Sequence, residues 1–508
     1  MSKFKLASIV FLLSTILLKF SSMIRDLVIA GFFGNSYMAD VYFAAMTIPN
    51  TIVLFMLTGM KDAFLPSYFK YDKLGRGFAH LTNIVKGTFW VSLAISIVGI
   101  ILTPLLMKWF YPDFASYEFG MKIAIWTSGV YFLSIALVGV NAVYEGYFDS
   151  QRKFSFSTFS QTIVVLTTIL STWIFHESLG IYAVPLGYLL GTVFSFLMKI
   201  VYLSPGRFMA WKQKMDFPEI KSFYQIFVPV GLTIAVGQVN LTINIIFAAT
   251  LGSGVVSSLN YAFRLVNIPQ AIFGVTIATI VYPILAQASS DKNSSLFKTG
   301  IEKGLSYMFL FLAPTVVGMI ILMEPIVQVV YQRGAFDAAA THATSTYALF
   351  YMGSVLFYSI QAVIAKGFYT LEKGHYMMRI GLISIVINII SNYFLSQIYG
   401  PIGLAASASI VGFIYSAITF STLYKISGGF SLPFIGKEYT KIIGATAVMA
   451  ASLWYIGKIE WIQNLHNIPF LIIMIILGAG LYFAVLYALR TSSFIELLAK
   501  GRKAKKVI

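Results

Sequence analysis

Apolar residues run along this chain in long blocks that are separated by short polar segments. The blocks recur throughout the 508 residues. Each has about 18 residues or more, enough to cross a hydrocarbon core about 30 Å thick as a helix. The pattern predicts about fourteen transmembrane helices. Their expected ranges are 6–33, 38–70, 82–110, 118–148, 155–176, 180–203, 220–250, 254–286, 298–330, 339–370, 377–397, 401–425, 436–458 and 467–489.

An internal repeat organises these helices. Ile48-Pro49-Asn50 recurs 220 residues later as Ile268-Pro269-Gln270, and Gly180 and Gly400 repeat the same spacing, as does a third match that begins at Asn141. The repeated unit holds six helices, an even number, so both copies enter the membrane in the same direction. We therefore expect an all-α integral membrane protein with two parallel six-helix lobes around a central cavity and two additional C-terminal helices. The expected divisions are an N-terminal lobe in 1–205, a C-terminal lobe in 206–430, two extra helices in 431–492 and a basic cytoplasmic tail in 493–508.

Lysine and arginine are unevenly distributed among the loops. They fill alternate loops and the C-terminal tail and are nearly absent from the other loops. Because basic residues stay on the cytoplasmic side, we expect a multi-pass protein of the bacterial cytoplasmic (inner) membrane with both termini in the cytoplasm. The same bias explains the net charge of +17 without a nucleic-acid partner. The basic tail, with Lys500, Arg502 and Lys503, is expected to lie on anionic membrane lipids.

Composition excludes several classes of function. Hydrophobic residues make up 58% of the chain and charged residues 11%, which leaves no room for an appended soluble catalytic domain. The absence of cysteine excludes disulfides and thiolate metal sites. The 5 histidines lack metal-ligand spacing, and the outer loops are too short for the acidic residues of a membrane glycosyltransferase. We expect no enzyme activity, no catalytic residue, no cofactor and no metal, and we expect a monomer.

The first predicted helix carries a polar stripe. Thr15, Lys19, Ser22 and Asp26 follow helical spacing, so they share one face of an otherwise apolar helix. Ionisable groups inside a membrane usually face a polar cavity or a partner. We expect this stripe, together with Arg25, to face the cavity and bind substrate. The alternative is that Arg25 and Asp26 lie near the outer headgroups and pair only with each other.

Other charged residues lie deeper in the chain. Asp40 opens the second span, where it either binds substrate or caps that helix. Lys61 and Asp62 are adjacent and are expected to form a local pair. Glu145 lies near the cytoplasmic end of the fourth span, where extension to the membrane surface is an alternative to a functional role. Arg264 has no acidic neighbour in sequence. We expect it to be an unpaired guanidinium that binds an anion, because its planar fork matches phosphate oxygens.

Prolines and asparagines within the spans suggest movement and cation binding. Pro49 and Pro269, which the repeat pairs, are expected to act as hinges. Two asparagine pairs each place two amide oxygens on one helix face and form a candidate cation site, with interhelical hydrogen bonding as the alternative. These residues are Asn240 and Asn244 in the seventh span and Asn388 and Asn392 in the eleventh.

Several of these motifs together resemble the bacterial lipid II flippases of the MurJ (MviN) family, within the multidrug/oligosaccharidyl-lipid/polysaccharide exporter superfamily. The early block is the more specific part, and the resemblance covers essentially the whole chain. The motifs are Arg25-Asp26, Phe32-Phe33-Gly34, Ala39-Asp40, Ile48-Pro49-Asn50, Ala63-Phe64-Leu65-Pro66, Tyr261-Ala262-Phe263-Arg264, Ile268-Pro269 and Arg333-Gly334-Ala335-Phe336-Asp337.

The resemblance implies a flippase that moves the undecaprenyl-pyrophosphate-linked peptidoglycan precursor outward by alternating access. By position, Lys19, Arg25 and Arg264 match basic cavity residues of the family, and Asp26 and Asp40 match acidic ones. The coupling ion stays open among Na+, H+ and the membrane potential. The alternatives for function are a flippase for an exopolysaccharide or teichoic-acid precursor, an ion-coupled drug exporter, a membrane enzyme and an assembly scaffold.

Overall fold

The computed structural model describes residues 3–203, 209–210 and 212–505, and within them the chain is almost entirely helical, with no strand. In this described part, helices occupy all fourteen predicted spans, and no predicted end lies more than five residues from the observed one. The eighth span consists of two α-helices joined by a π-helical turn. The elements are α1 (Lys3–Phe33), α2 (Tyr37–Asp72), α3 (Gly77–Phe110), η1 (Pro112–Ser116), α4 (Gly120–Ser150), α5 (Phe154–Leu179), η2 (Gly180–Tyr182), α6 (Ala183–Leu203), α8 (Phe217–Ala249), α9 (Val255–Pro269), η3 (Gln270–Gly274), α10 (Val275–Ser290), α11 (Ser294–Tyr331), α12 (Ala338–Thr370), α13 (Gly374–Tyr399), α14 (Pro401–Ile426), α15 (Leu432–Ile456), α16 (Glu460–Gln463), α17 (Asn467–Ala488) and α18 (Ser492–Lys505).

The helices have the length and apolar composition of membrane spans. Among the described residues, ten helical stretches are long and apolar enough to cross a membrane, and one of them, Phe154–Leu203, contains both α5 and α6. Many large apolar side chains on these helices are exposed, as expected for surfaces that face lipid. The predicted all-α membrane fold is confirmed.

Two repeated glycines adopt the same backbone conformation. Gly180 ends α5 with φ 56° and ψ −140°, and Gly400 ends α13 with φ 56° and ψ −137°. In each case the glycine N–H bonds to a carbonyl four residues earlier, that of His176 or Ser396. Side chains other than glycine rarely adopt this positive φ. The two turns therefore share a local structure as well as a spacing in sequence.

The chain forms two compact units. The first contains residues 1–257 and 333–337, and the second contains residues 258–332 and 338–508. Helix α8, the seventh span, packs against α2 and α3 within the first unit. The predicted division into lobes at residues 205 and 430 concerns the sequence repeat, and it stays a prediction.

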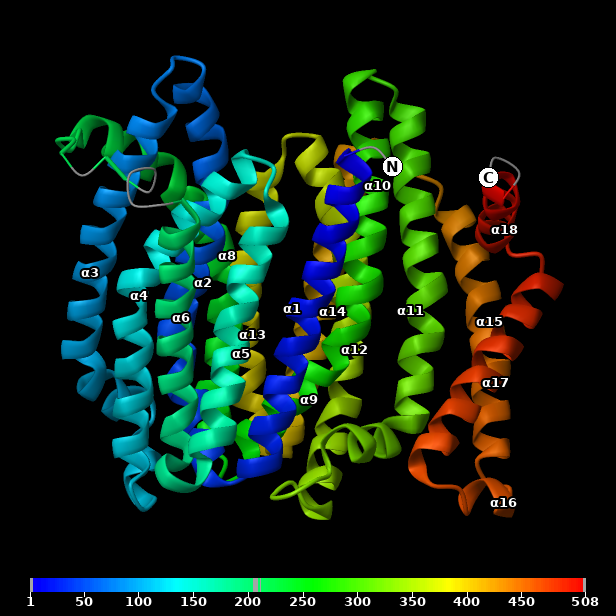
Figure 1. Ribbon diagram of the computed structural model, residues 1–508. Helices are drawn as coiled ribbons and strands as arrows, with labels where there is room; N and C mark the ends of the chain where they lie inside the picture. The colour runs from blue at the N-terminus through cyan, green and yellow to red at the C-terminus, as the bar shows by residue number, and fades with distance from the viewer. Residues whose placement is uncertain (1–2, 204–208, 211, 506–508) are drawn as a thin grey trace. The chain divides into compact units, whose positions relative to one another are not determined.

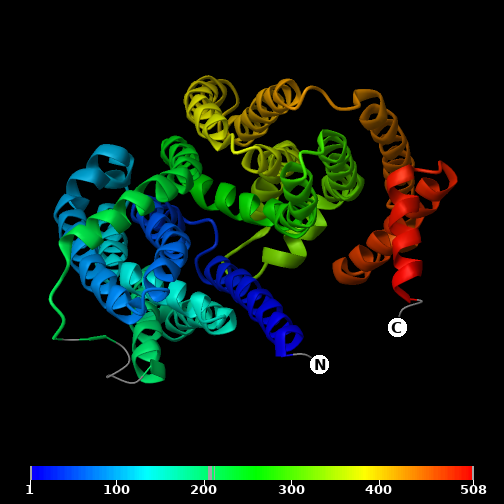
Figure 2. The same ribbon diagram turned by 90° about the horizontal axis from the view of Figure 1, so that it is seen from above.

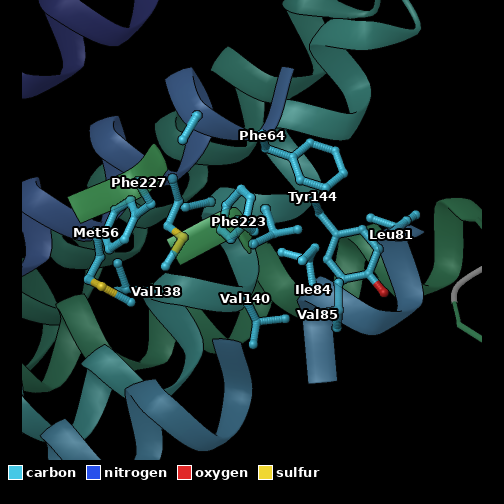
Figure 3. Packing of buried hydrophobic residues seen from close by; sticks show 14 of the residues in the cluster. Met56, Phe64, Leu81, Ile84, Val85, Val138, Val140, Tyr144, Phe223 and Phe227 are labelled. Carbon is cyan, nitrogen blue, oxygen red and sulfur yellow. The ribbon is translucent and has the colours of Figure 1, made fainter. Parts of the chain in front are cut away.

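The core of the first unit lies where α2, α3, α4 and α8 meet. Figure 3 shows Phe64 and Tyr144 among the side chains of this cluster, with Phe223 and Phe227 of α8 packed into it. Lipid is as apolar as these side chains, so close packing rather than transfer out of water holds the helices together. Small residues permit that approach: a Cβ at Gly139 of α4 would lie 2.1 Å from Ser92 Oγ of α3.

In the second unit, α15 and α17 pack on α11. Figures 1 and 2 show this C-terminal pair, coloured orange to red, running alongside α11. Tyr482 of α17 is buried and donates its hydroxyl to the carbonyl of Leu310 at 2.6 Å, and Met449 and Met474 fill the contact between α15 and α17. The two helices outside the sequence repeat are therefore attached to the second unit.

Candidate functional site

The side chains of the polar stripe on α1 become more buried from Lys19 to Asp26. Lys19 is exposed, Ser22 is half-buried and donates to the carbonyl of Leu18 at 2.9 Å, and Asp26 is buried. Arg25 donates through Nη2 to Asp26 Oδ1 at 2.9 Å and through Nε at 3.1 Å. The alternative that Arg25 and Asp26 pair with each other thus describes part of their environment. The paired guanidinium retains further N–H donors that can bind an anion.

Asp40 caps a helix other than its own. Helix α2 is capped by Ser36, whose hydroxyl oxygen accepts from Ala39 N–H, whereas the carboxylate of Asp40 accepts from the backbone N–H groups of Gly254 and Ser257. Gly254 directly precedes α9, which begins at Val255, and Ser257 lies in its first turn. The alternative that Asp40 caps the second span is wrong, and its expected role in binding substrate stays a prediction. The carboxylate instead fixes the start of the eighth span, where it complements the positive end of the helix dipole.

Arg264 of α9 has a defined partner. Its Nε donates to Asn260 Oδ1, one turn earlier, at 2.6 Å. The expectation of an unpaired guanidinium was therefore wrong. A guanidinium has five N–H donors, so this bond orients the group without using its whole capacity for an anion.

Two motifs of the family resemblance contact each other within the first unit. Ala335, in the loop after α11, donates its N–H to the carbonyl of Gly31 near the end of α1 at 2.8 Å. Gly34 has φ 56°, and a Cβ there would lie 2.3 Å from the carbonyl oxygen of Ala335. A glycine is required at this position for both reasons. The segment 333–337 is thus held on the end of α1, although it lies about 300 residues away in sequence.

The two predicted hinge prolines differ in their surroundings. Pro49 lies inside α2, which continues as an α-helix through it. Pro269 ends α9, and the chain continues as the π-helical turn Gln270–Gly274 before α10. A π-helical turn marks a change in the helical hydrogen-bond pattern, as often occurs at functional positions. The hinge role of both prolines stays a prediction.

The asparagines of the candidate cation site fall in separate units. Asn240 and Asn244 belong to the first unit and Asn388 and Asn392 to the second. Asn392 is fully buried and donates through Nδ2 to Asn388 Oδ1 at 3.3 Å, a hydrogen bond within one helix. No group of three or more His, Cys, Asp or Glu side chains with metal-binding geometry occurs among the residues that the structure describes.

A buried polar network in the first unit was not found from the sequence. Lys199 of α6 pairs with Glu145 of α4 at 3.3 Å, and both side chains are almost fully buried, so the surface-extension alternative for Glu145 is wrong. Lys61 pairs with Asp149 at 2.9 Å. The expected local pair of Lys61 with Asp62 is therefore wrong. The only sequence feature that could have indicated this network is a lysine inside the apolar sixth span. Its partner, however, lies on another helix.

A second buried cluster holds the start of α8. The imidazole of His80, on α3, hydrogen-bonds through Nδ1 to Glu219 of α8 and lies 2.9 Å through Nε2 from the hydroxyl of Ser67 on α2. The backbone of Asp216, just before α8, bonds to the side chain of Asn83 through its N–H at 2.9 Å and its carbonyl at 3.0 Å. The repeat boundary is therefore fixed to the first unit by side chains of α2 and α3.

An apolar pocket lies within the second unit. It has a volume of about 360 Å³ and is bounded by residues of α11, α15 and α17 together with Phe273. Pro314 and Gly318 of α11 line one wall, and Met474 and Gly478 of α17 line another. Such a lining suits a hydrocarbon chain and offers almost no polar group to a headgroup.

The chemistry of these residues favours binding over catalysis. Arg25 of α1 and Arg264 of α9 are held by neighbouring side chains and can bind an anionic group, and the second unit offers an apolar pocket.

The family model and the similar curated protein have the same name. Residues 29–476 match the family model described as "Lipid II flippase MurJ". A protein of that name from Burkholderia cenocepacia is 25% identical over 497 residues, which cover 94% of this chain and 95% of that protein. The solved structure "Lipid II flippase MurJ, inward closed conformation" is 24% identical with a TM-score of 0.79, over 94% of this chain and 98% of that one. An inward-facing multidrug resistance MATE family transporter of the MOP superfamily is 13% identical, with a TM-score of 0.66 over 83% of this chain and 98% of that one. The structural likenesses show a shared fold.

Proposed function

This chain belongs to the MurJ family of lipid II flippases, and from that premise we propose that it moves lipid II from the cytoplasmic to the outer leaflet by alternating access. The observation that carries the proposal is the family match, which extends over most of the chain. Transport of an intact lipid breaks no bond, so the proposed function includes no chemical step. The protein therefore acts as a transporter and not as an enzyme.

The pyrophosphate of the substrate is bound by the cations that the sequence singled out. Lys19 and Arg25 of α1 and Arg264 of α9 supply the positive charge. Ser22 adds a hydroxyl on the stripe of α1. Charge-assisted hydrogen bonds from guanidinium groups are strong and geometrically specific for phosphate oxygens. Asp26 supports this role because it fixes the guanidinium of Arg25.

The apolar pocket of the second unit takes part of the polyprenyl chain. Its walls expose methionine, leucine and aromatic side chains, and a lipid tail gains close contacts in such a groove. Pro314 and Gly318 leave the wall of α11 open, because a Cβ on Gly318 would meet no atom closer than Met449 Cε at 4.0 Å.

Filling the pocket is expected to slow transport. Gly318→Leu places a side chain in the space for the tail, and we expect a transport rate about tenfold lower, since about two methylene groups lose their site. Gly480→Leu on α17 is the matched control, because this glycine is exposed and a Cβ there meets nothing within 4 Å. Both variants are compared in vesicles with labelled lipid II. Equal rates for Gly318→Leu and Gly480→Leu would show that the tail lies elsewhere.

The distribution of basic residues supports a location and an orientation in the membrane. We propose that the chain lies in the bacterial cytoplasmic membrane as a monomer with both termini in the cytoplasm, and that its basic tail lies on anionic lipids. A Na+ or H+ gradient or the membrane potential supplies the energy for transport, with no cofactor.

Two experiments test the proposed function: complementation of cells that lack their own flippase, and a transport assay with the purified protein. The gene is expected to restore growth and shape to cells depleted of their own lipid II flippase, and the purified chain is expected to move labelled lipid II across vesicles. If the chain is well expressed but neither restores growth nor moves lipid II, the proposal is wrong. Transport of another lipid-linked oligosaccharide in the same vesicles would then identify the cargo.

A further inference from the structure

The side chain of Lys199 ends inside the first unit and not at the membrane surface. It has no exposed area, although it lies only four residues before α6 ends at Leu203. A lysine this close to the end of a membrane helix ordinarily extends its ammonium group to the headgroups. Groups inside the unit must therefore hold the ammonium in place.

Three oxygen atoms surround this ammonium group. Lys199 Nζ donates to Asn141 Oδ1 at 2.8 Å, to Ser195 Oγ at 3.1 Å and to Glu145 Oε1 at 3.3 Å. An ammonium group has three N–H donors. Each donor thus has one acceptor, and the charge of Glu145 compensates that of Lys199.

Neighbouring side chains position these oxygens. Glu145 also accepts from Gln161 Nε2 at 2.6 Å and from Ser160 Oγ at 3.3 Å, both on α5. Asn141 donates through Nδ2 to the carbonyl of Thr192 on α6 at 3.3 Å, which leaves its Oδ1 directed at the ammonium. Helices α4, α5 and α6 pack side by side here (Figure 1). These three oxygens, called the oxygen cage below, therefore come from α4 and α6, and α5 helps to position the carboxylate of Glu145.

From this geometry we propose that Asn141, Glu145 and Ser195 form a monovalent-cation site that Lys199 fills with its own ammonium group. The distances of 2.8 to 3.3 Å exceed the ~2.0–2.6 Å that small divalent cations prefer, so the cage suits a cation of the size of K+ or NH4+. The first unit carries this cation permanently and needs none from solution. At the 220-residue offset, Lys199 corresponds to the neutral Thr419, whose hydroxyl donates to the carbonyl of Tyr415 on its own helix.

The proposal predicts that removing the lysine opens the cage to dissolved cations. Lys199→Met keeps an unbranched side chain but removes the ammonium, which leaves the carboxylate of Glu145 buried without its counter-charge. We expect the melting temperature of the purified full-length variant to be at least ~2 °C higher in KCl or NH4Cl than in choline chloride of equal ionic strength. The unsubstituted protein is expected to melt at the same temperature in all three salts.

Two further variants separate a filled cation site from an ordinary ion pair. Lys61→Met removes the partner of Asp149 in an ion pair that is less deeply buried than that of Lys199 and Glu145, so it should show no preference for K+. Glu145→Gln combined with Lys199→Met removes the negative charge and should abolish the preference. The proposal is overturned if Lys199→Met melts alike in KCl and choline chloride. It is also overturned if that variant cannot be purified in KCl while the double variant can. Since the measurement is stability, its outcome is independent of which substrate the protein transports.

Discussion

Arg264→Ala is expected to abolish lipid II transport while the protein still folds and inserts. The guanidinium is the cation of α9 that we propose to bind the pyrophosphate. A hydrogen bond to a charged group contributes about 1.5–3 kcal/mol, or about 10-fold to 100-fold in binding. Loss of two such bonds brings transport below detection. The measurement is labelled lipid II movement in vesicles, together with rescue of flippase-depleted cells.

Matched variants test whether the fork geometry or only the charge of Arg264 matters. Arg264→Lys keeps the charge but loses the planar fork, so we expect partial transport. Asn260→Ala removes the acceptor that orients Nε and leaves the guanidinium, so its effect should be smaller than that of Arg264→Ala. Normal flipping by Arg264→Ala, at wild-type amounts in the membrane, would exclude a role for this residue in binding the substrate.

The second large effect is expected from Asp40→Ala. The substitution leaves the N–H groups of Gly254 and Ser257 buried without their acceptor, and each such group costs about 1–3 kcal/mol. We expect the free energy of unfolding to fall by at least about 2 kcal/mol, which for a chain of this length lowers the melting temperature by about 2 °C or more. Transport should fall as well, because α9 also carries Arg264.

Two substitutions on α2 provide the controls for Asp40. Asp40→Asn keeps one oxygen, which can accept from only one of the two N–H groups, and turns its NH2 group toward the other, so its loss of stability should be smaller than that of Asp40→Ala. Asp62→Ala removes an exposed carboxylate from the same helix and should have no effect. If Asp40→Ala melts at the temperature of Asp62→Ala, the cap does not hold the start of α9.

Local chemistry was sufficient for some features of the site. The pairing of Arg25 with Asp26 was among the alternatives because adjacent opposite charges on one helix are within reach of each other. The stripe from Lys19 to Asp26 followed from helical spacing alone. The structure adds that exposure decreases along this stripe, which depends on the neighbours that cover the end of α1.

Other features required partners that no local pattern specifies. For Asp40 the sequence left open a cap on its own helix or a bond to substrate, because a local pattern shows only the nearest helix start, yet its partners lie more than 200 residues away. The sequence offers Arg264 no acidic neighbour, whereas in the structure the amide oxygen of Asn260 accepts a hydrogen bond from its guanidinium group. Lys61 pairs with Asp149 across two helices, although Asp62 is next to it in sequence.

The sequence by itself determined the fourteen spans, the all-α fold and the family resemblance, because hydropathy and length decide whether a segment crosses a membrane independently of its neighbours. Only the tertiary structure decided which helix faces meet. It placed α8 in the first unit, enclosed Lys199 in three oxygens and set Asp40 against the start of α9. Inside a membrane every span is apolar, so hydrophobicity does not select one packing partner over another. That selection comes from small residues, buried charges and helix caps, which act only when distant segments are brought together.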